Sequence, residues 1–190
     1  MVVDTKRGPY AKGLARRAQI LEAALAAYAS SGPQGPSLRS IADTVGLTEA
    51  GVLHYFDSKD ELLVEILAAR DRADVAAFDL TTLEGAWALL EHATHTPGLV
   101  KLFLDMTVAS ASADHPAREL MQRRAHTIFD IMGRFYSEDE PWKPRVMLAA
   151  AEGLQIQWLR DPSVDIVADL RLLHEQLLGC PRERPYTKGA

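Results

Sequence analysis

The apolar positions near the start of the chain recur at the spacing of an amphipathic helix. They are separated by three or four residues, which places them on one helical face; these positions are Leu14, Ala18, Leu21, Leu25 and Tyr28. The pattern stops at a Ser-Ser-Gly-Pro run over residues 30–33, where glycine and proline disfavour a continuing helix. We therefore predict a helix that ends near residue 30 and follows a basic arm over residues 1–11.

Two short helices are predicted next. Ser37 offers an N-cap hydroxyl, and Gly46 offers the left-handed backbone that often ends a helix. Thr48 is a second N-cap, for a helix that runs to about Tyr55. Between the caps, the residues expected to face inward are Leu38, Ile41, Ala42 and Val45. Two short helices joined by a three-residue turn that contains glycine are typical of a helix-turn-helix.

The rest of the chain also has helical patterning. A longer helix starts at Asp57-Ser58 and runs to about Ala77; its predicted buried face is Leu62, Leu63, Ile66 and Leu67. Breaks that contain proline separate five further predicted helices, at about 82–95, 98–112, 117–137, 142–159 and 164–178. No hairpin signal occurs. The pattern therefore predicts an all-α fold of about nine helices.

Composition narrows the class of protein. Hydrophobic residues make up 47% and charged residues 25%, as in ordinary soluble domains. No stretch approaches the ~18 consecutive apolar residues that a membrane span needs, and no signal peptide is evident. Cys180 is the only cysteine, which excludes disulfides within the chain and cysteine-rich metal sites. These features lead us to expect a cytoplasmic protein without membrane partners.

Charge is distributed unevenly along the chain. Residues 1–59 hold seven Lys/Arg and five Asp/Glu, whereas the whole chain holds 21 and 26 and has a net charge of −5. The first part is therefore weakly basic and the remainder acidic. This asymmetry fits one end that meets DNA phosphate and a body that does not, although a fluctuation of a few charges would give the same count.

One stretch resembles a known family. The segment SLRSIADTVGLTEAGVLHYFDSKDELL (37–63), above all GVLHYFDSKDELL (51–63), resembles the TetR (tetracycline-repressor) family of one-component regulators. The resemblance implies a homodimer that binds a palindromic double-stranded DNA operator and is released by a small molecule. It divides the chain into a DNA-binding helix-turn-helix domain (1–59), a helical ligand-binding and dimerisation domain (60–179) and a tail (180–190).

The resemblance also implies which residues contact DNA. In the predicted recognition helix, Ala50 and Gly51 allow close approach to the bases, and Ala50 can contact a thymine methyl. Arg39 corresponds to a position that can donate two hydrogen bonds to guanine. The full predicted set is Ser37, Arg39, Thr48, Glu49, Ala50, Gly51, His54, Tyr55 and Lys59.

Some of these residues have other interpretations. Arg39 could be a solvated helix charge, Tyr55 could be packed rather than bound to phosphate, and Lys59 could pair with Glu61. Phe56 is expected in the core. Leu53 stands where many relatives have an aromatic residue, and Glu49 suits DNA only if it accepts a hydrogen bond from a cytosine amine.

The C-terminal half carries looser expectations. GLQIQWLRDPSVDIV (153–167) resembles the end of the family's ligand-binding body, whose last two helices pair across a dimer. We predict interface positions at Gly153, Leu170, Leu173 and Leu177, although this stripe could instead pack within one subunit. Candidate effector contacts are Trp87, Phe103, Met106, His126, Phe129, Met132 and Gln155, although such residues at helical spacing are more often plain core.

Other chemistry finds little support in the sequence. His92 and His95 have the spacing of paired ligands, but no acidic or cysteine signature accompanies them, so no metal is expected. No nucleophile elbow, phosphate-binding loop or metalloprotease motif occurs, and we expect neither an enzyme nor a cofactor. The alternative function is a helical ligand-binding or adaptor protein that has lost specific DNA binding.

Overall fold

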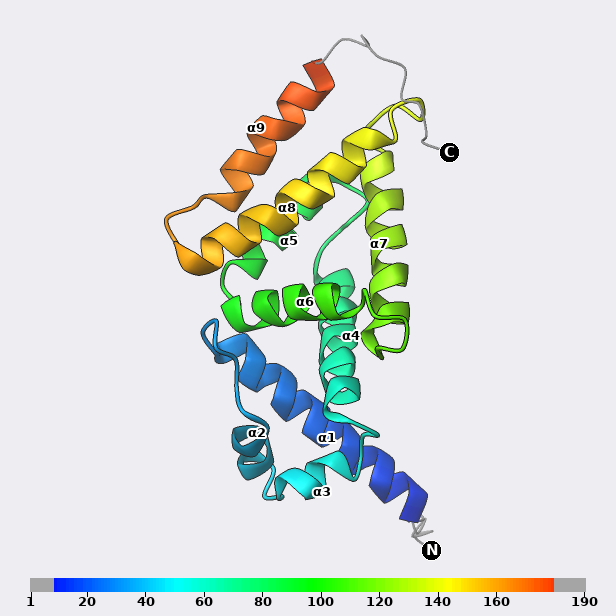
Figure 1. The fold of residues 1–190 in the computed structure, drawn as a ribbon, viewed down its shortest axis with the longest axis vertical. Coiled ribbons are helices and arrows are strands. Elements are labelled where there is room, and N and C mark those ends of the chain that lie inside the picture. Colours follow the sequence, from blue (N-terminus) through cyan, green and yellow to red (C-terminus); the bar gives the residue numbers. More distant parts are fainter. Residues whose placement is uncertain (1–8, 180–190) are drawn as a thin grey trace, which may run out of the picture.

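The computed structural model describes residues 9–179. This part of the chain contains nine α-helices and no strand, as the sequence predicts (Figure 1). The helices are α1 (Pro9–Ser30), α2 (Leu38–Thr44), α3 (Glu49–Leu53), α4 (Lys59–Ala77), α5 (Leu83–Ala93), α6 (Pro97–Ala109), α7 (Ala117–Gly133), α8 (Trp142–Arg160) and α9 (Ile166–Gly179).

The predicted caps of the two short helices are present. The Ser37 hydroxyl accepts a hydrogen bond from the Ser40 amide at 3.0 Å, and the Thr48 hydroxyl accepts one from the Gly51 amide at 3.0 Å. Gly46 has a φ of +66°, which glycine adopts without steric cost. Helix α3 ends at Leu53, earlier than the sequence suggested.

Helix α1 differs from the prediction in its start and in its buried face. It begins at Pro9, so residues 9–11 of the predicted arm are helical, as proline at the first helical position allows; residues 1–8 lie outside the described residues. The predicted stripe is wrong at its start, because Leu14 is 51% exposed and Ala18 is exposed. The buried stripe is Ile20, Ala24 and Tyr28.

Two arginines explain this shift of the α1 face. The Arg16 guanidinium donates to the Val45 carbonyl at 2.5 Å, and the Arg17 Nε donates to the Tyr55 carbonyl at 3.1 Å. Their side chains occupy the inner face of the first turns, where the sequence pattern placed leucine and alanine. Polar contacts thus replace apolar packing at this end of the helix.

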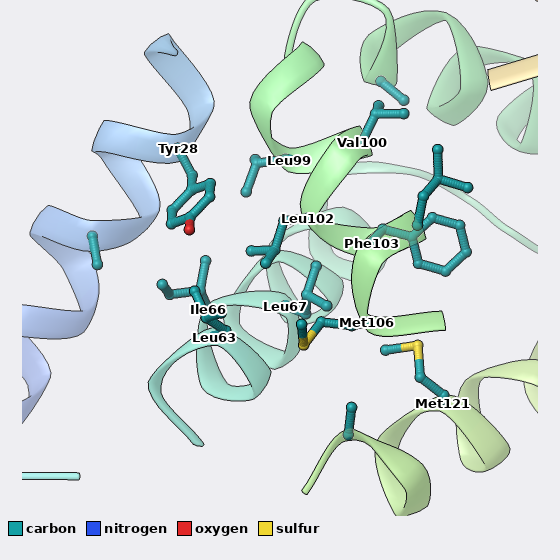
Figure 2. Close-up of a cluster of buried hydrophobic side chains, with 14 of the residues drawn as sticks. Tyr28, Leu63, Ile66, Leu67, Leu99, Val100, Leu102, Phe103, Met106 and Met121 are labelled. Atoms are coloured by element: carbon teal, nitrogen blue, oxygen red, sulfur yellow. The ribbon is translucent and has the colours of Figure 1, made fainter. Parts of the chain in front are cut away.

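Helices α1–α3, called the reader below, and helices α5–α9, called the body, share one hydrophobic core. Helix α4 leaves the α1–α3 group and passes behind α6 in the view of Figure 1. In Figure 2, Tyr28 points from α1 towards Leu63 and Ile66 of α4 and towards Leu99 and Leu102 of α6. The predicted inner face of α4 is buried as expected. This core connects the reader rigidly to the body.

The reader and the body approach each other closely at Gly98. Its amide donates to the Ser31 carbonyl at 3.2 Å, and a Cβ at this position would lie 2.1 Å from the Ser31 hydroxyl and 2.6 Å from the Tyr28 carbonyl oxygen. Only glycine allows the N-terminus of α6 to sit this close to the C-terminus of α1.

The remaining helices form the distal end of the body. Helix α7 stands beside α6 and α8, while α8 and α9 pack side by side with α5 behind them (Figure 1). The body helices match the predicted ones, with ends that differ by up to four residues. Among the described residues, no helix is long and apolar enough to span a membrane.

Candidate DNA-binding surface and effector cavity

The α2–α3 surface presents the predicted DNA contacts. Seven of the nine side chains are exposed, and Gly51 and Tyr55 are half-buried. Val52 and Phe56 anchor the opposite side of α3 in the core, at 0% and 3% exposure. Because the core holds that side, the exposed residues of α3 face outward; they are Glu49 and Ala50.

Gly51 has a local role that the sequence did not indicate. A Cβ there would lie 3.2 Å from the Thr48 hydroxyl and 3.5 Å from the Leu47 Cβ. The residue therefore leaves room for the α3 cap and for Leu47, in addition to any approach to DNA.

Arg17 and two glutamates form a charged cluster between α1 and α4 that the sequence did not reveal. Arg17 of α1 forms ion pairs with Glu61 and Glu65 of α4, and its guanidinium lies 4.6 Å from the Phe56 ring centroid. The hydrogen bond to Glu65 raises the pKa of Arg17. Glu61 pairs with Arg17 rather than with Lys59, which is exposed at the start of α4. The cluster fixes α4 relative to α1.

A cavity of about 170 Å³ lies among the body helices. Its wall takes residues from α4 through α9 and is mostly apolar. Four of the predicted effector contacts line it, namely Trp87, Phe103, Met132 and Gln155.

Three predicted contacts do not line this cavity. Met106 is buried in the core between α6 and α4 (Figure 2). His126 is exposed on α7, and its Nδ1 lies 2.8 Å from the Gln122 carbonyl oxygen. Phe129 is half-buried, next to the lining residue Ile128 but on a different face of α7. Helical spacing alone did not distinguish these faces.

The cavity also contains charged residues that the sequence did not single out. Arg70 and Asp74 form an ion pair at 3.4 Å within α4. Arg124 of α7 reaches across to pair with Asp71 of α4, and its guanidinium lies 4.5 Å from the Phe103 ring centroid. Burial raises the pKa of Asp71, although Arg124 opposes the shift. Burial likewise lowers the pKa of Arg70.

A second hollow shares part of its lining with this cavity. Its volume is about 240 Å³. The residues that line both spaces are Phe103, Arg124, Ile128, Leu148 and Glu152. Burial raises the pKa of Glu152, with Arg124 acting in the opposite direction. Together the two spaces fall at the lower end of the size range of small-molecule sites, about 300–1,000 Å³.

The predicted dimer stripe is partly internal. Leu170 and Leu177 are 1% and 7% exposed within this single chain, so the alternative of packing within one subunit holds for them. Leu173 and Gly153 are half-buried. The open apolar positions of α8 and α9 are displaced around the helices, at Val146, Ile156, Leu172 and Leu178.

The two histidines with ligand-like spacing make other contacts. The His92 ring packs 5.4 Å from the Phe78 centroid, and the His95 Nδ1 lies 3.1 Å from the Glu91 carbonyl oxygen. Across residues 9–179, no cluster of three or more His, Cys, Asp or Glu could hold a metal ion.

Sequence comparisons find relatives of the helix-turn-helix segment. Residues 20–66 match the model of bacterial regulatory proteins of the tetR family. The HTH-type transcriptional repressor KstR2 of Mycobacterium tuberculosis is 32% identical over 107 residues, which cover 51% of this chain and 54% of that protein. KstR2 of Rhodococcus jostii is 36% identical over 52 residues, which cover 27% of this chain and 26% of that protein. The chain thus matches about half the length, or less, of these curated relatives.

Solved structures extend the likeness to the whole fold. A transcriptional regulator from a Rhodococcus species superposes with a TM-score of 0.60 at 16% identity, covering 86% of this chain and 96% of that one. The fatty acid degradation regulator FadR of Bacillus halodurans gives 0.58 at 19%, covering 95% and 100%. FadR of Thermus thermophilus, solved in complex with lauroyl-CoA, gives 0.51 at 18%, covering 91% and 100%. The helix-turn-helix segment thus matches the tetR family of bacterial regulatory proteins, and the all-α fold is shared with these solved regulators.

Proposed function

We propose that this protein is a transcriptional repressor that binds a palindromic DNA operator as a homodimer and releases it when a small molecule occupies the body cavity. The observation that carries the proposal is the exposed α2–α3 surface, which lies within the segment that matches the family. Exposed side chains on a short helix backed by a rigid core suit insertion into a major groove.

Each exposed group has a defined task at this surface. Arg39, in the first turn of α2, donates to a guanine edge, and Ala50 contacts a thymine methyl. The Ser37 and Thr48 hydroxyls accept from backbone amides, which leaves their protons free to donate to phosphate. The remaining phosphate contacts are His54, Tyr55 and Lys59, and Glu49 accepts from a cytosine amine.

A second copy of the chain covers the open face of α8 and α9. Exposed small and apolar residues on α8 and α9 form this face, together with the half-buried Gly153; the exposed residues are Val146, Ala149, Ile156 and Leu172. Small residues allow helices to approach closely. A two-fold pair of this kind is what two operator half-sites, roughly 34–36 Å apart, require.

The effector acts through α4. This helix begins at the reader, contributes Arg70 and Asp74 to the cavity wall, and pairs with α7 through Asp71. A molecule that favours a different tilt of α4 changes the separation of the two α3 helices in the dimer. Such a molecule therefore lowers the affinity for operator DNA.

An electrophoretic mobility shift with the DNA that flanks the protein's own gene tests DNA binding. We expect retention by the wild-type chain and by Arg72→Ala, which removes an exposed arginine of α4, but weakened retention by Arg39→Ala. If the wild-type chain does not retain this DNA better than unrelated DNA, the alternative of a helical ligand-binding or adaptor protein is favoured.

A further inference from the structure

Two buried polar atoms lack a hydrogen-bond partner in the described part of the chain, and both belong to residues of the same cavity wall. They are the Gln155 Oε1 and the Arg124 Nε. Gln155 is only 9% exposed, and the Arg124 Nη1 pairs with Asp71. Leaving a buried acceptor and a buried donor unpaired is costly, so their shared location calls for a group that satisfies both.

The charges around the cavity set a second condition. Its lining includes two cations, Arg70 and Arg124, and each already has an acidic partner. Glu152 adds a further carboxyl group that no cation neutralises by a direct ion pair in the described residues. An anion placed here would therefore find no surplus positive charge, and an uncompensated buried charge is strongly disfavoured.

We infer that the part of the effector inside the cavity is an uncharged, mostly apolar chain or ring with one hydroxyl group, whose proton is donated to the Gln155 Oε1 and whose oxygen accepts from the Arg124 Nε. This inference rests on the proposed function, because it describes the chemistry of the proposed effector site. The apolar lining residues, among them Trp87 and Phe103, accommodate the rest of the molecule.

The link from Arg124 to Asp71 gives this contact a consequence for α4. The guanidinium stacks on Phe103 and pairs with Asp71, so a ligand oxygen that draws the Nε into the cavity must shift the same side chain that holds α4 to α7. Recognition of the hydroxyl and release of α4 thus use one side chain.

Two isomeric probes of the same size and similar apolarity differ in whether they carry a hydrogen-bond donor. n-Octanol carries a donor and an acceptor, whereas methyl heptyl ether has the same atoms but only an acceptor. In calorimetric titrations of the full-length chain, we expect n-octanol to bind about tenfold more tightly than the ether, since the ether leaves the buried Gln155 oxygen unpaired. Octanoate, which carries a negative charge, is expected to bind more weakly than n-octanol.

The variant Gln155→Leu tests the assigned acceptor and has a matched control. Leucine has a similar size and needs no partner, so the variant should bind both isomers with equal affinity. Gln157→Leu changes an exposed glutamine on the same helix and should keep the preference of the wild-type chain. Because the comparison of the isomers uses the wild-type chain, it does not depend on the folding of any variant.

Several outcomes would overturn the inference. Equal binding of the two isomers by the wild-type chain would remove Gln155 as an acceptor, and tightest binding of octanoate would show that the cavity takes an anion. Absence of binding by all three probes would show that the cavity does not admit such chains. Each of these results leaves operator retention without probe unchanged, whereas loss of that retention would refute the proposed function itself.

Discussion

Arg124 of α7 and Asp71 of α4 form an ion pair at the wall of the body cavity, and the same arginine lies over the Phe103 ring of α6. Three helices thus meet at one guanidinium. Helix α4 is also tied to the reader at its other end, where Glu61 and Glu65 pair with Arg17 of α1. Helix α4 therefore joins the ion pair at the cavity wall to the ion pairs with α1.

Asp71→Asn is expected to weaken the coupling between cavity and operator. In a switch with about 1–3 kcal/mol of coupling, saturating operator weakens ligand binding some 5–150-fold, and ligand weakens operator binding by the same factor. The asparagine cannot form the ion pair, so the ratio of the two ligand affinities should move towards one. Titrations of n-octanol with and without operator measure this ratio. Asp105→Asn, which removes an exposed pair with Lys101, should leave the factor unchanged. An unchanged factor in Asp71→Asn would remove this pair from the coupling.

Arg39→Ala and Lys59→Ala are expected to affect DNA binding in different ways. Loss of a guanine contact should cost about 1–3 kcal/mol and relax discrimination at one base pair, whereas loss of a phosphate contact should weaken all sequences alike and reduce the salt dependence. Both side chains are exposed, so neither change should alter the fold. Binding titrations against a set of single-base operator variants distinguish the two. Equal weakening across the set by Arg39→Ala would refute its base-reading role.

Gly98→Ala should destabilise the junction of reader and body. The added methyl would lie far inside van der Waals distance of the Tyr28 carbonyl oxygen and the Ser31 hydroxyl, and forced overpacking costs typically about 1–3 kcal/mol. Gly133→Ala is the matched control, because a Cβ there meets nothing within 4 Å. Urea unfolding should show a lower midpoint for Gly98→Ala than for the control. Equal midpoints would mean that α1 and α6 separate at little cost.

The reader was predictable from sequence because local signals specify it. Ser37, Gly46 and Thr48 each act on the backbone within a few residues, so their caps and turn follow from residue type alone. The motif then supplied nine candidate contacts, of which the structure leaves seven exposed and two half-buried.

The cavity was less predictable because tertiary packing decides it. Arg123 and Arg124 are identical in type and adjacent in sequence, yet the first pairs with Glu119 on the outside of α7 and the second lines the cavity. Likewise, Leu170 is buried and Leu172 is 58% exposed, although both lie in one leucine-rich run. Spacing identifies a helix, but a neighbouring helix determines which face is inside.

Leu172→Asp is expected to separate the subunits without unfolding them. The side chain is open in the single chain, so a carboxylate there is solvated in the monomer but would be buried and unpaired in the proposed dimer. Leu170→Asp should instead unfold the body, because that position is already in the core. Light scattering combined with circular dichroism distinguishes a folded monomer from an unfolded chain. An intact dimer of Leu172→Asp would place the interface elsewhere.

Glu152→Gln should stabilise the protein at neutral pH and lose this advantage in acid. Burial raises the pKa of Glu152 above its ordinary value, so the folded state binds a proton more tightly than the unfolded state. The contribution of this group to stability is therefore present below the ordinary carboxyl pKa and is lost as the pH rises through the raised value. The neutral amide avoids that loss, so its melting temperature should exceed that of the wild-type chain at pH about 7 and approach it near the ordinary pKa of about 4.

The control for this pH effect is Glu22→Gln, which changes an exposed carboxyl group of α1. Its melting temperature should follow that of the wild-type chain across the same pH range, because a solvated carboxyl group has nearly the same proton affinity in the folded and unfolded states. Thermal unfolding at several pH values measures both variants. A constant difference between Glu152→Gln and the wild-type chain at every pH would mean that packing of the amide, rather than ionisation of Glu152, causes the change. In that case the Glu152 carboxylate is adequately solvated at the cavity wall. Its charge would then no longer count against an anionic effector.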